Sequence, residues 1–147
     1  MTQAAVSRRT ALLGLVALPA GAALGAEAAQ VEAAIAAVTG GRATEGGGMA
    51  LRLPALSENG AQVPLTIQVE SPMTAADHVV AIHLFATRNP TPGVASFHLS
   101  PALGRAEVQT RIRLAEDQAV VAIAVLSDGR LRRAAAETRV ATGGCLG

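Results

Sequence analysis

Residues 63–70 read VPLTIQVE, a stretch in which an aliphatic side chain stands at every second position. Residues 107–114, EVQTRIRL, show the same alternation from Val108 onward. Successive side chains of a β-strand point to opposite faces of its sheet, so this period of two predicts strands with one buried face. Further apolar runs predict strands over residues 78–86, 94–100, 118–126 and 131–140. Together these stretches predict an all-β domain.

Turn residues separate the predicted strands. Asn59-Gly60 and Asp128-Gly129 are typical of hairpin turns, because these residue types tolerate positive φ. Residues 89–93, NPTPG, predict a loop, since proline cannot donate to a sheet ladder. About seven short strands punctuated in this way indicate an immunoglobulin-like β-sandwich, which we place at residues 49–140. The disulfide and core tryptophan of antibody domains are absent from this chain, which has one Cys and no Trp.

A short helix is expected before the sandwich. Apolar residues recur at helical spacing over residues 27–38, and Gly40-Gly41 would end the helix. The triplet 46–48 is all glycine and predicts a flexible joint. Residues 29–48 are therefore read as an N-terminal helix followed by a glycine-rich joint.

Two predicted strands are apolar on both faces, over residues 79–86 and 119–126. A two-layer sandwich buries only one face of each sheet, so the second apolar face needs a cover. A protein partner is the cover we favour, and the helix at 27–38 is the alternative.

The first 28 residues carry the pattern of an export signal. Arg8 and Arg9 precede an apolar run that Pro19 interrupts, and small residues follow. The run is shorter than the roughly 20 residues that cross a bilayer. The arginine pair favours a twin-arginine (Tat) signal, with a general secretory signal as the alternative. The mature chain would then begin between Ala26 and Ala29 and work in the periplasm.

The charge balance is close to neutral. The formal net charge is +1, and the twelve basic residues include Arg8 and Arg9 of the predicted signal. This composition gives no electrostatic argument for binding nucleic acid or a membrane surface.

The single cysteine is Cys145, in the terminal segment TGGCLG. An unpaired cysteine in an exported protein suggests either a reactive thiol or an intermolecular disulfide, such as one that links a homodimer. Gly143 and Gly144 predict a mobile backbone before it, so we read residues 141–147 as a flexible arm. Five residues beyond a last strand that ends at Val140 would reach about 17 Å at roughly 3.4 Å each. No neighbouring residue in the sequence would activate the thiol, which suggests that it reacts inside the site of another protein.

Short motifs in matching order and spacing also link the chain to a known family. They are Leu53-Pro54, Glu58-Asn59-Gly60, Val63-Pro64-Leu65, Ser71-Pro72-Met73, Asn89-Pro90, Gly104-Arg105-Ala106, Thr110-Arg111-Ile112-Arg113-Leu114-Ala115, Gln118, Asp128-Gly129 and Gly143-Gly144-Cys145. With these motifs the chain resembles the SoxY family, the sulfur-carrier subunits of the bacterial Sox thiosulfate-oxidising system. The resemblance covers the whole predicted mature chain.

The resemblance implies a carrier that needs no cofactor and is not itself an enzyme. Cys145 would be the covalent attachment point, on an arm of Gly143, Gly144, Leu146 and Gly147. A SoxZ-like subunit would pair with the chain as a heterodimer or heterotetramer. The haem protein SoxXA, SoxB and SoxCD would be transient partners that load, hydrolyse and oxidise the bound sulfur. The family's tail is typically Gly-Gly-Cys-Gly-Gly, so Leu146 is a departure that adds bulk beside the sulfur.

The sequence leaves three alternatives to a carrier. A copper site could draw on six residues: Met49, Met73, His78, His83, His98 and Cys145. His78 and His83 differ in parity, which predicts opposite faces of one strand and argues against that site. Hydrolase activity is disfavoured because Asp77-His78 has no Gly-x-Ser-x-Gly partner motif. The third possibility is a structural sandwich whose tail has no function.

Overall fold

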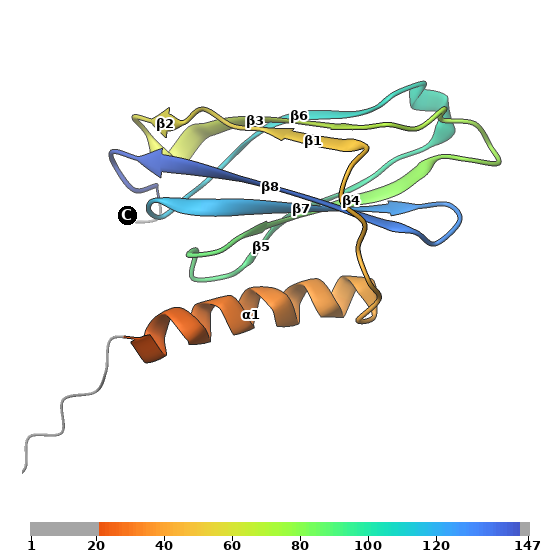
Figure 1. Cartoon of the computed structure of the whole chain (residues 1–147). Helices are drawn as coiled ribbons and strands as arrows, with labels where there is room; N and C mark the ends of the chain where they lie inside the picture. The colour runs from red at the N-terminus through yellow and green to blue at the C-terminus, as the bar shows by residue number, and fades with distance from the viewer. Residues whose placement is uncertain (1–20, 145–147) are drawn as a thin grey trace, which may run out of the picture.

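The computed structural model describes residues 21–144 and confirms a two-sheet sandwich with one N-terminal helix (Figure 1). One sheet has the strand order β1-β3-β6, and the other has the order β2-β8-β7-β4-β5. The strands of the first sheet are β1 (Met49–Arg52), β3 (Val63–Val69) and β6 (Ala106–Ile112). Those of the second are β2 (Leu56–Ser57), β4 (Val79–Ala86), β5 (Gly93–His98), β7 (Gln118–Leu126) and β8 (Leu131–Val140). The helix is α1 (Gly21–Thr39), and two short 3-10 helices are η1 (Gly60–Gln62) and η2 (Pro101–Leu103).

The alternating stretches form half-buried strands, as predicted. In β3 every second residue from Val63 to Val69 is buried, and the strand pairs antiparallel with β6 so that Leu65 lies opposite Thr110. The predicted strands at 118–126 and 131–140 coincide with β7 and β8. Strand β6 ends two residues earlier than the expected 107–114, which leaves Leu114 in a connecting segment with a fully buried side chain.

Helix α1 covers the apolar outer face of the larger sheet (Figure 1). Val31 and Ile35 are 3% and 4% exposed and pack against Phe85, Val121 and Ile123. The expectation that a partner protein covers this face is therefore wrong, because a helix of the same chain does so. The physical reason is the apolar stripe of the helix, because Val31, Ala34 and Ile35 lie within the expected range 27–38 and face the sheet. The observed helix is longer than expected and begins at Gly21.

Polar contacts fix the helix and the joint that follows it. The Glu32 carboxylate accepts a hydrogen bond from the Arg133 guanidinium at 2.8 Å, which ties α1 to β8 and holds the pKa of Glu32 below its usual value. Gly40 adopts φ 65°, and its N–H donates a hydrogen bond to the carbonyl of Ala36. The helix therefore ends with a glycine in the left-handed conformation. The joint is tethered, since the Arg132 guanidinium donates to the Gly48 carbonyl at 2.8 Å.

The two predicted hairpin turns have different outcomes. Asp128-Gly129 does join β7 to β8 as a hairpin, with Gly129 at φ 87°. Asn59-Gly60 does not form a hairpin, because the strands on either side of it belong to different sheets. The chain crosses between the sheets there through η1, and the Asn59 side chain accepts a hydrogen bond from the N–H of Ala61 at 2.8 Å. The residue types at 59–60 correctly predict a break between two strands. They do not indicate which sheet each of the flanking strands joins.

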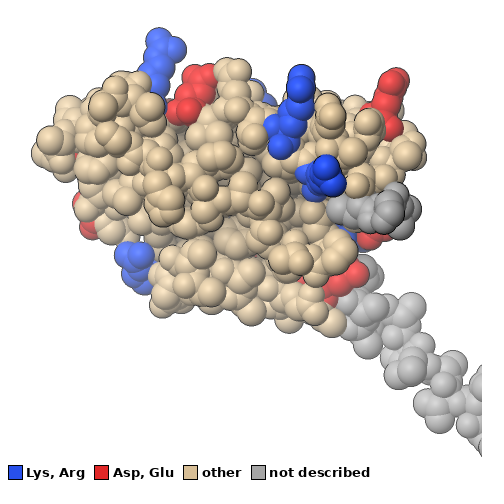
Figure 2. Space-filling model, turned by 180° about the vertical axis from the view of Figure 1, so that it is seen from behind, with Lys and Arg blue, Asp and Glu red and all other residues tan. Residues whose placement is uncertain are grey.

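Charged residues on the face seen in Figure 2 are scattered singly over a largely uncharged surface. Within residues 21–144, no helix combines the length and the hydropathy needed to cross a membrane.

Candidate functional site: the base of the C-terminal arm

The predicted arm leaves the sandwich at Val140, at the end of β8 (Figure 1). Of the predicted site residues, Gly143 and Gly144 lie within the described part of the chain. Cys145, Leu146 and Gly147 lie outside it, as do Arg8 and Arg9 of the predicted export signal, with all of residues 1–20. The base of the arm can therefore be described, and the thiol cannot.

Residues 141–144 are hydrogen-bonded to the domain. The N–H of Gly60 donates to the carbonyl of Thr142 at 2.8 Å, and the N–H of Gly144 donates to the carbonyl of Leu114 at 2.9 Å. The expectation that the flexible arm begins at residue 141 is therefore corrected, because the backbone is paired as far as Gly144. The pairing satisfies amide and carbonyl groups that the end of β8 would otherwise leave unbonded.

Two glycines make this pairing possible by close backbone approach. A Cβ on Gly144 would collide with the backbone of Gly60 and Ala61. A Cβ on Gly60 would collide with the Leu114 carbonyl and would lie 2.7 Å from the Gly144 nitrogen. Neither glycine has positive φ among the described residues, so the requirement is for space and not for an unusual backbone angle. The composition of the tail predicts mobility at Gly144, whereas in the structure this glycine permits close packing.

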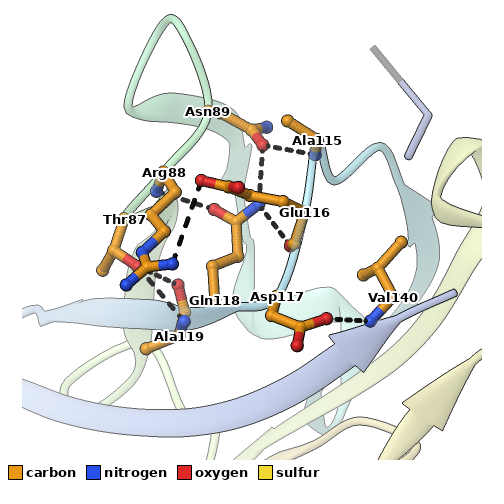
Figure 3. Close-up of polar contacts among 9 residues, drawn as sticks. All are labelled: Thr87, Arg88, Asn89, Ala115, Glu116, Asp117, Gln118, Ala119 and Val140. Carbon is orange, nitrogen blue, oxygen red and sulfur yellow. Dashed lines mark hydrogen bonds and ion pairs between the residues drawn. The ribbon is translucent and has the colours of Figure 1, made fainter. Parts of the chain in front are cut away.

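A polar network fixes the segment against which the arm packs (Figure 3). The Asn89 side chain donates to the Arg113 carbonyl at 2.8 Å and accepts from the N–H of Ala115 at 3.0 Å. The Gln118 amide, in a residue only 6% exposed, donates to Asn89 Oδ1 at 2.9 Å and accepts from the N–H of Arg88 at 2.8 Å. These contacts hold residues 113–118 in place.

A second contact in the same view holds the last residue of β8. The Asp117 carboxylate accepts a hydrogen bond from the N–H of Val140 at 2.7 Å (Figure 3). The arm therefore starts from a fixed point. No sequence pattern predicts a role for Asp117, and the only signal for Asn89 and Gln118 is that both fall within the family motifs named above.

A hollow of about 590 Å³ lies beside this network. Its lining mixes Arg88 and Arg139 with Asp117 and Glu137. Because two arginines and two carboxylates share the lining, the hollow carries no charge of one sign with which to select a ligand.

The histidines are placed away from the arm. His83 and His98 share the outer face of β4 and β5, with ring centroids 6.5 Å apart, and His83 Nδ1 lies 2.8 Å from Ser96 Oγ. Burial, and then the neighbouring His98, lower the pKa of His83. A bulge between Val79 and Ala81 breaks the parity argument that separated His78 from His83. Within residues 21–144, no three His, Cys, Asp or Glu side chains are grouped so as to hold a metal ion.

Comparison with known proteins identifies one family. The family model described as "Sulfur oxidation protein SoxY" matches residues 35–145, a span that ends on Cys145. The solved structure of the sulfur carrier protein SoxY from Chlorobium limicola f thiosulfatophilum is 32% identical, with a TM-score of 0.64. The alignment covers 77% of this chain and 97% of that one. No curated protein matches the sequence.

More distant structures share the fold alone. The superoxide reductase (neelaredoxin) from Ignicoccus hospitalis is 17% identical with a TM-score of 0.56, and the match covers 64% of this chain and 80% of that one. The superoxide reductase from Nanoarchaeum equitans is 14% identical with a TM-score of 0.50, covering 64% and 96%. At these identities the likeness extends to the sandwich and not to the chemistry.

Proposed function

The chain belongs to the SoxY family of sulfur oxidation proteins, and we propose that it carries thiosulfate-derived sulfur covalently on Cys145. The observation that carries this proposal is the family match, which runs through the sandwich and the arm to residue 145 itself. Cys145 is the only cysteine in the sequence, so it is the only thiol to which sulfur can be attached.

Loading is an oxidation. The thiolate of Cys145 and the outer sulfur of thiosulfate form a new S–S bond, giving a cysteine S-thiosulfonate, and two electrons leave. A haem protein of the SoxXA type is the electron acceptor. The carrier supplies the nucleophile and needs no cofactor of its own for this step, and the thiolate is the reactive form of the thiol.

Unloading begins with hydrolysis. Water attacks the terminal sulfonate sulfur, and the S–S bond to that sulfur breaks. Sulfate and two protons are released, and a persulfide remains on Cys145. A SoxB-type hydrolase would supply the site for this reaction. A SoxCD-type enzyme would then accept six electrons from the outer persulfide sulfur, while three water molecules supply its oxygen atoms and six protons leave, which gives a cysteine S-sulfonate. A second hydrolysis would break the S–S bond, release sulfate and two protons, and restore the Cys145 thiolate.

The same family membership supports a proposal for location and partner. We propose that a Tat-type signal in residues 1–28 exports the chain to the periplasm and that a SoxZ-like subunit pairs with it. Because α1 already covers the outer face of the larger sheet, such a subunit would bind elsewhere on the sandwich.

A Cys145→Ser variant tests the proposal. Oxidation of thiosulfate by a reconstituted system or by the complemented host should fall to the level of a strain lacking the chain. The circular dichroism melting curve should stay unchanged, because residue 145 follows the paired segment. Leu146→Gly, which restores the usual family residue, is the matched control and should retain full turnover. Undiminished thiosulfate oxidation by Cys145→Ser would overturn the carrier role.

A further inference from the structure

The docked base of the arm limits how far residue 145 can travel. With Gly144 bonded to Leu114, a single residue step separates the last anchored amide from Cys145, which is a reach of about 3.4 Å. If the anchored stretch is released as far as Val140, five residues extend to about 17 Å. Release would therefore extend the reach of residue 145 about fivefold.

We infer that Gly60 is a positioning residue, and that its close contact with Gly144 is a latch that holds the arm in a short-reach position. The contact lies outside the covalent chemistry proposed above. It joins two parts of the sequence more than eighty residues apart, at the place where the arm leaves the domain.

The latch is built from successive backbone hydrogen bonds. The N–H of Leu114 donates to the Gly60 carbonyl at 2.8 Å, and the Leu114 carbonyl accepts from the N–H of Gly144 at 2.9 Å. Nearer to β8, the N–H of Ala141 donates to the Ser57 carbonyl at 2.9 Å. Residues 141–144 therefore pair with Ser57, Gly60 and Leu114. None of these three residues belongs to β3 or β6, so the segment can dissociate without breaking the pairing of those strands.

The two ends of the latch differ in how firmly they are fixed. Leu114 has a fully buried side chain and its neighbours are held by Asn89, so the acceptor side is part of the core. Val140 is fixed by Asp117. The segment between Val140 and Cys145 is bonded through backbone groups, and Gly144 contributes no side chain. Opening should therefore pivot after Val140, and residues 141–144 should detach as a unit.

The glycines set the strength of the latch. A methyl group at position 144 would overlap the backbone of Gly60 and Ala61, so Gly144→Ala should dissociate the arm while the sandwich stays folded. Gly60→Ala should have the same effect on the arm, but it also strains the crossing between the sheets. Gly46→Ala is the matched control, because a Cβ there meets nothing within 4 Å.

A nitroxide spin label on Cys145 of the full mature chain reports the state of the arm. We expect the wild-type spectrum to contain a slow-motion component, and we expect Gly144→Ala to reduce that component at least twofold. Gly46→Ala should leave the spectrum unchanged. Equal spectra for wild type and Gly144→Ala would overturn the latch.

Hydrogen exchange supplies a readout that needs no label. The N–H of Gly60 should exchange at least tenfold faster in Gly144→Ala than in the wild type, since its acceptor Thr142 moves away with the arm. An unchanged Gly60 exchange rate would also overturn the latch. The physiological role of the latch rests on the proposed carrier function, but neither experiment involves sulfur. If Gly144→Ala left both readouts unchanged while Cys145→Ser was inactive, the latch would fail and the carrier role would stand. If Gly144→Ala released the arm while Cys145→Ser stayed active, the latch would stand and the carrier role would fail.

Discussion

Truncation of Ile35 tests whether α1 is the cover of the larger sheet. The side chain is 4% exposed and packs in a cluster with Phe85 and Val121. Replacing a buried isoleucine by alanine costs about 2–5 kcal/mol of unfolding free energy, and by valine about 0.5–1.5 kcal/mol. Ile35 lies in an outer layer that can relax, and alanine favours a helix by about 0.5 kcal/mol over isoleucine. We therefore expect about 2–3 kcal/mol for Ile35→Ala and less than about 1 kcal/mol for Ile35→Val.

The assay is urea unfolding of the mature chain followed by far-ultraviolet circular dichroism, because the sequence has no Trp or Tyr to report by fluorescence. The midpoint should fall by about 1–2 M for Ile35→Ala. Leu103→Ala is the control, since this leucine is 60% exposed and its loss should change stability by less than about 0.5 kcal/mol. If Ile35→Ala behaved like Leu103→Ala, the helix would not be docked and the outer face would again need a partner.

Three further perturbations address the arm base, the helix contact and the polar network. Gly60→Ala should lower the unfolding free energy by about 1.5–4 kcal/mol, because up to three backbone hydrogen bonds at the arm base are displaced, whereas Gly46→Ala should stay within about 1 kcal/mol of the wild type by urea unfolding. The Arg133 hydrogen bond lowers the pKa of Glu32, so this contribution is present above the ordinary value of 4.5 and is lost as pH falls through the folded-state pKa. The wild type should thus lose slightly more stability on acidification than Glu32→Gln, and an equal or smaller loss would count against the ion pair. Gln118→Ala leaves several partly buried polar groups unpaired and should cost about 1–3 kcal/mol by calorimetry or urea unfolding, while a neutral effect would show that the network is not structural.

The strands were predictable from sequence because their signal is local. Alternation over 63–70 fixes which side chains of β3 face the core, and the pairing of β7 with β8 follows from Asp128-Gly129 between two apolar runs. The identity of the cover was not predictable in this way. An apolar outer face at Val121 indicates that another element packs there. It does not indicate whether that element is α1 or part of another protein.

The arm base was not predictable for a similar reason. Gly143-Gly144 has the composition of a mobile linker, and Asn59-Gly60 has that of a turn. Their meeting depends on where β8 ends relative to the crossing between the sheets, which is a tertiary relation. Glycine permits both motion and close approach, so its presence alone does not distinguish a free arm from a docked one.

The carrier assignment depends most directly on what is bonded to Cys145 during turnover. Intact-protein and peptide mass spectrometry of the chain, purified without reductant from cells oxidising thiosulfate, would measure this. The account predicts sulfane and sulfonate adducts confined to the C-terminal peptide, which are removed by reduction and are lacking in cells grown without a reduced sulfur source. An unmodified Cys145 thiol throughout active thiosulfate oxidation would contradict it.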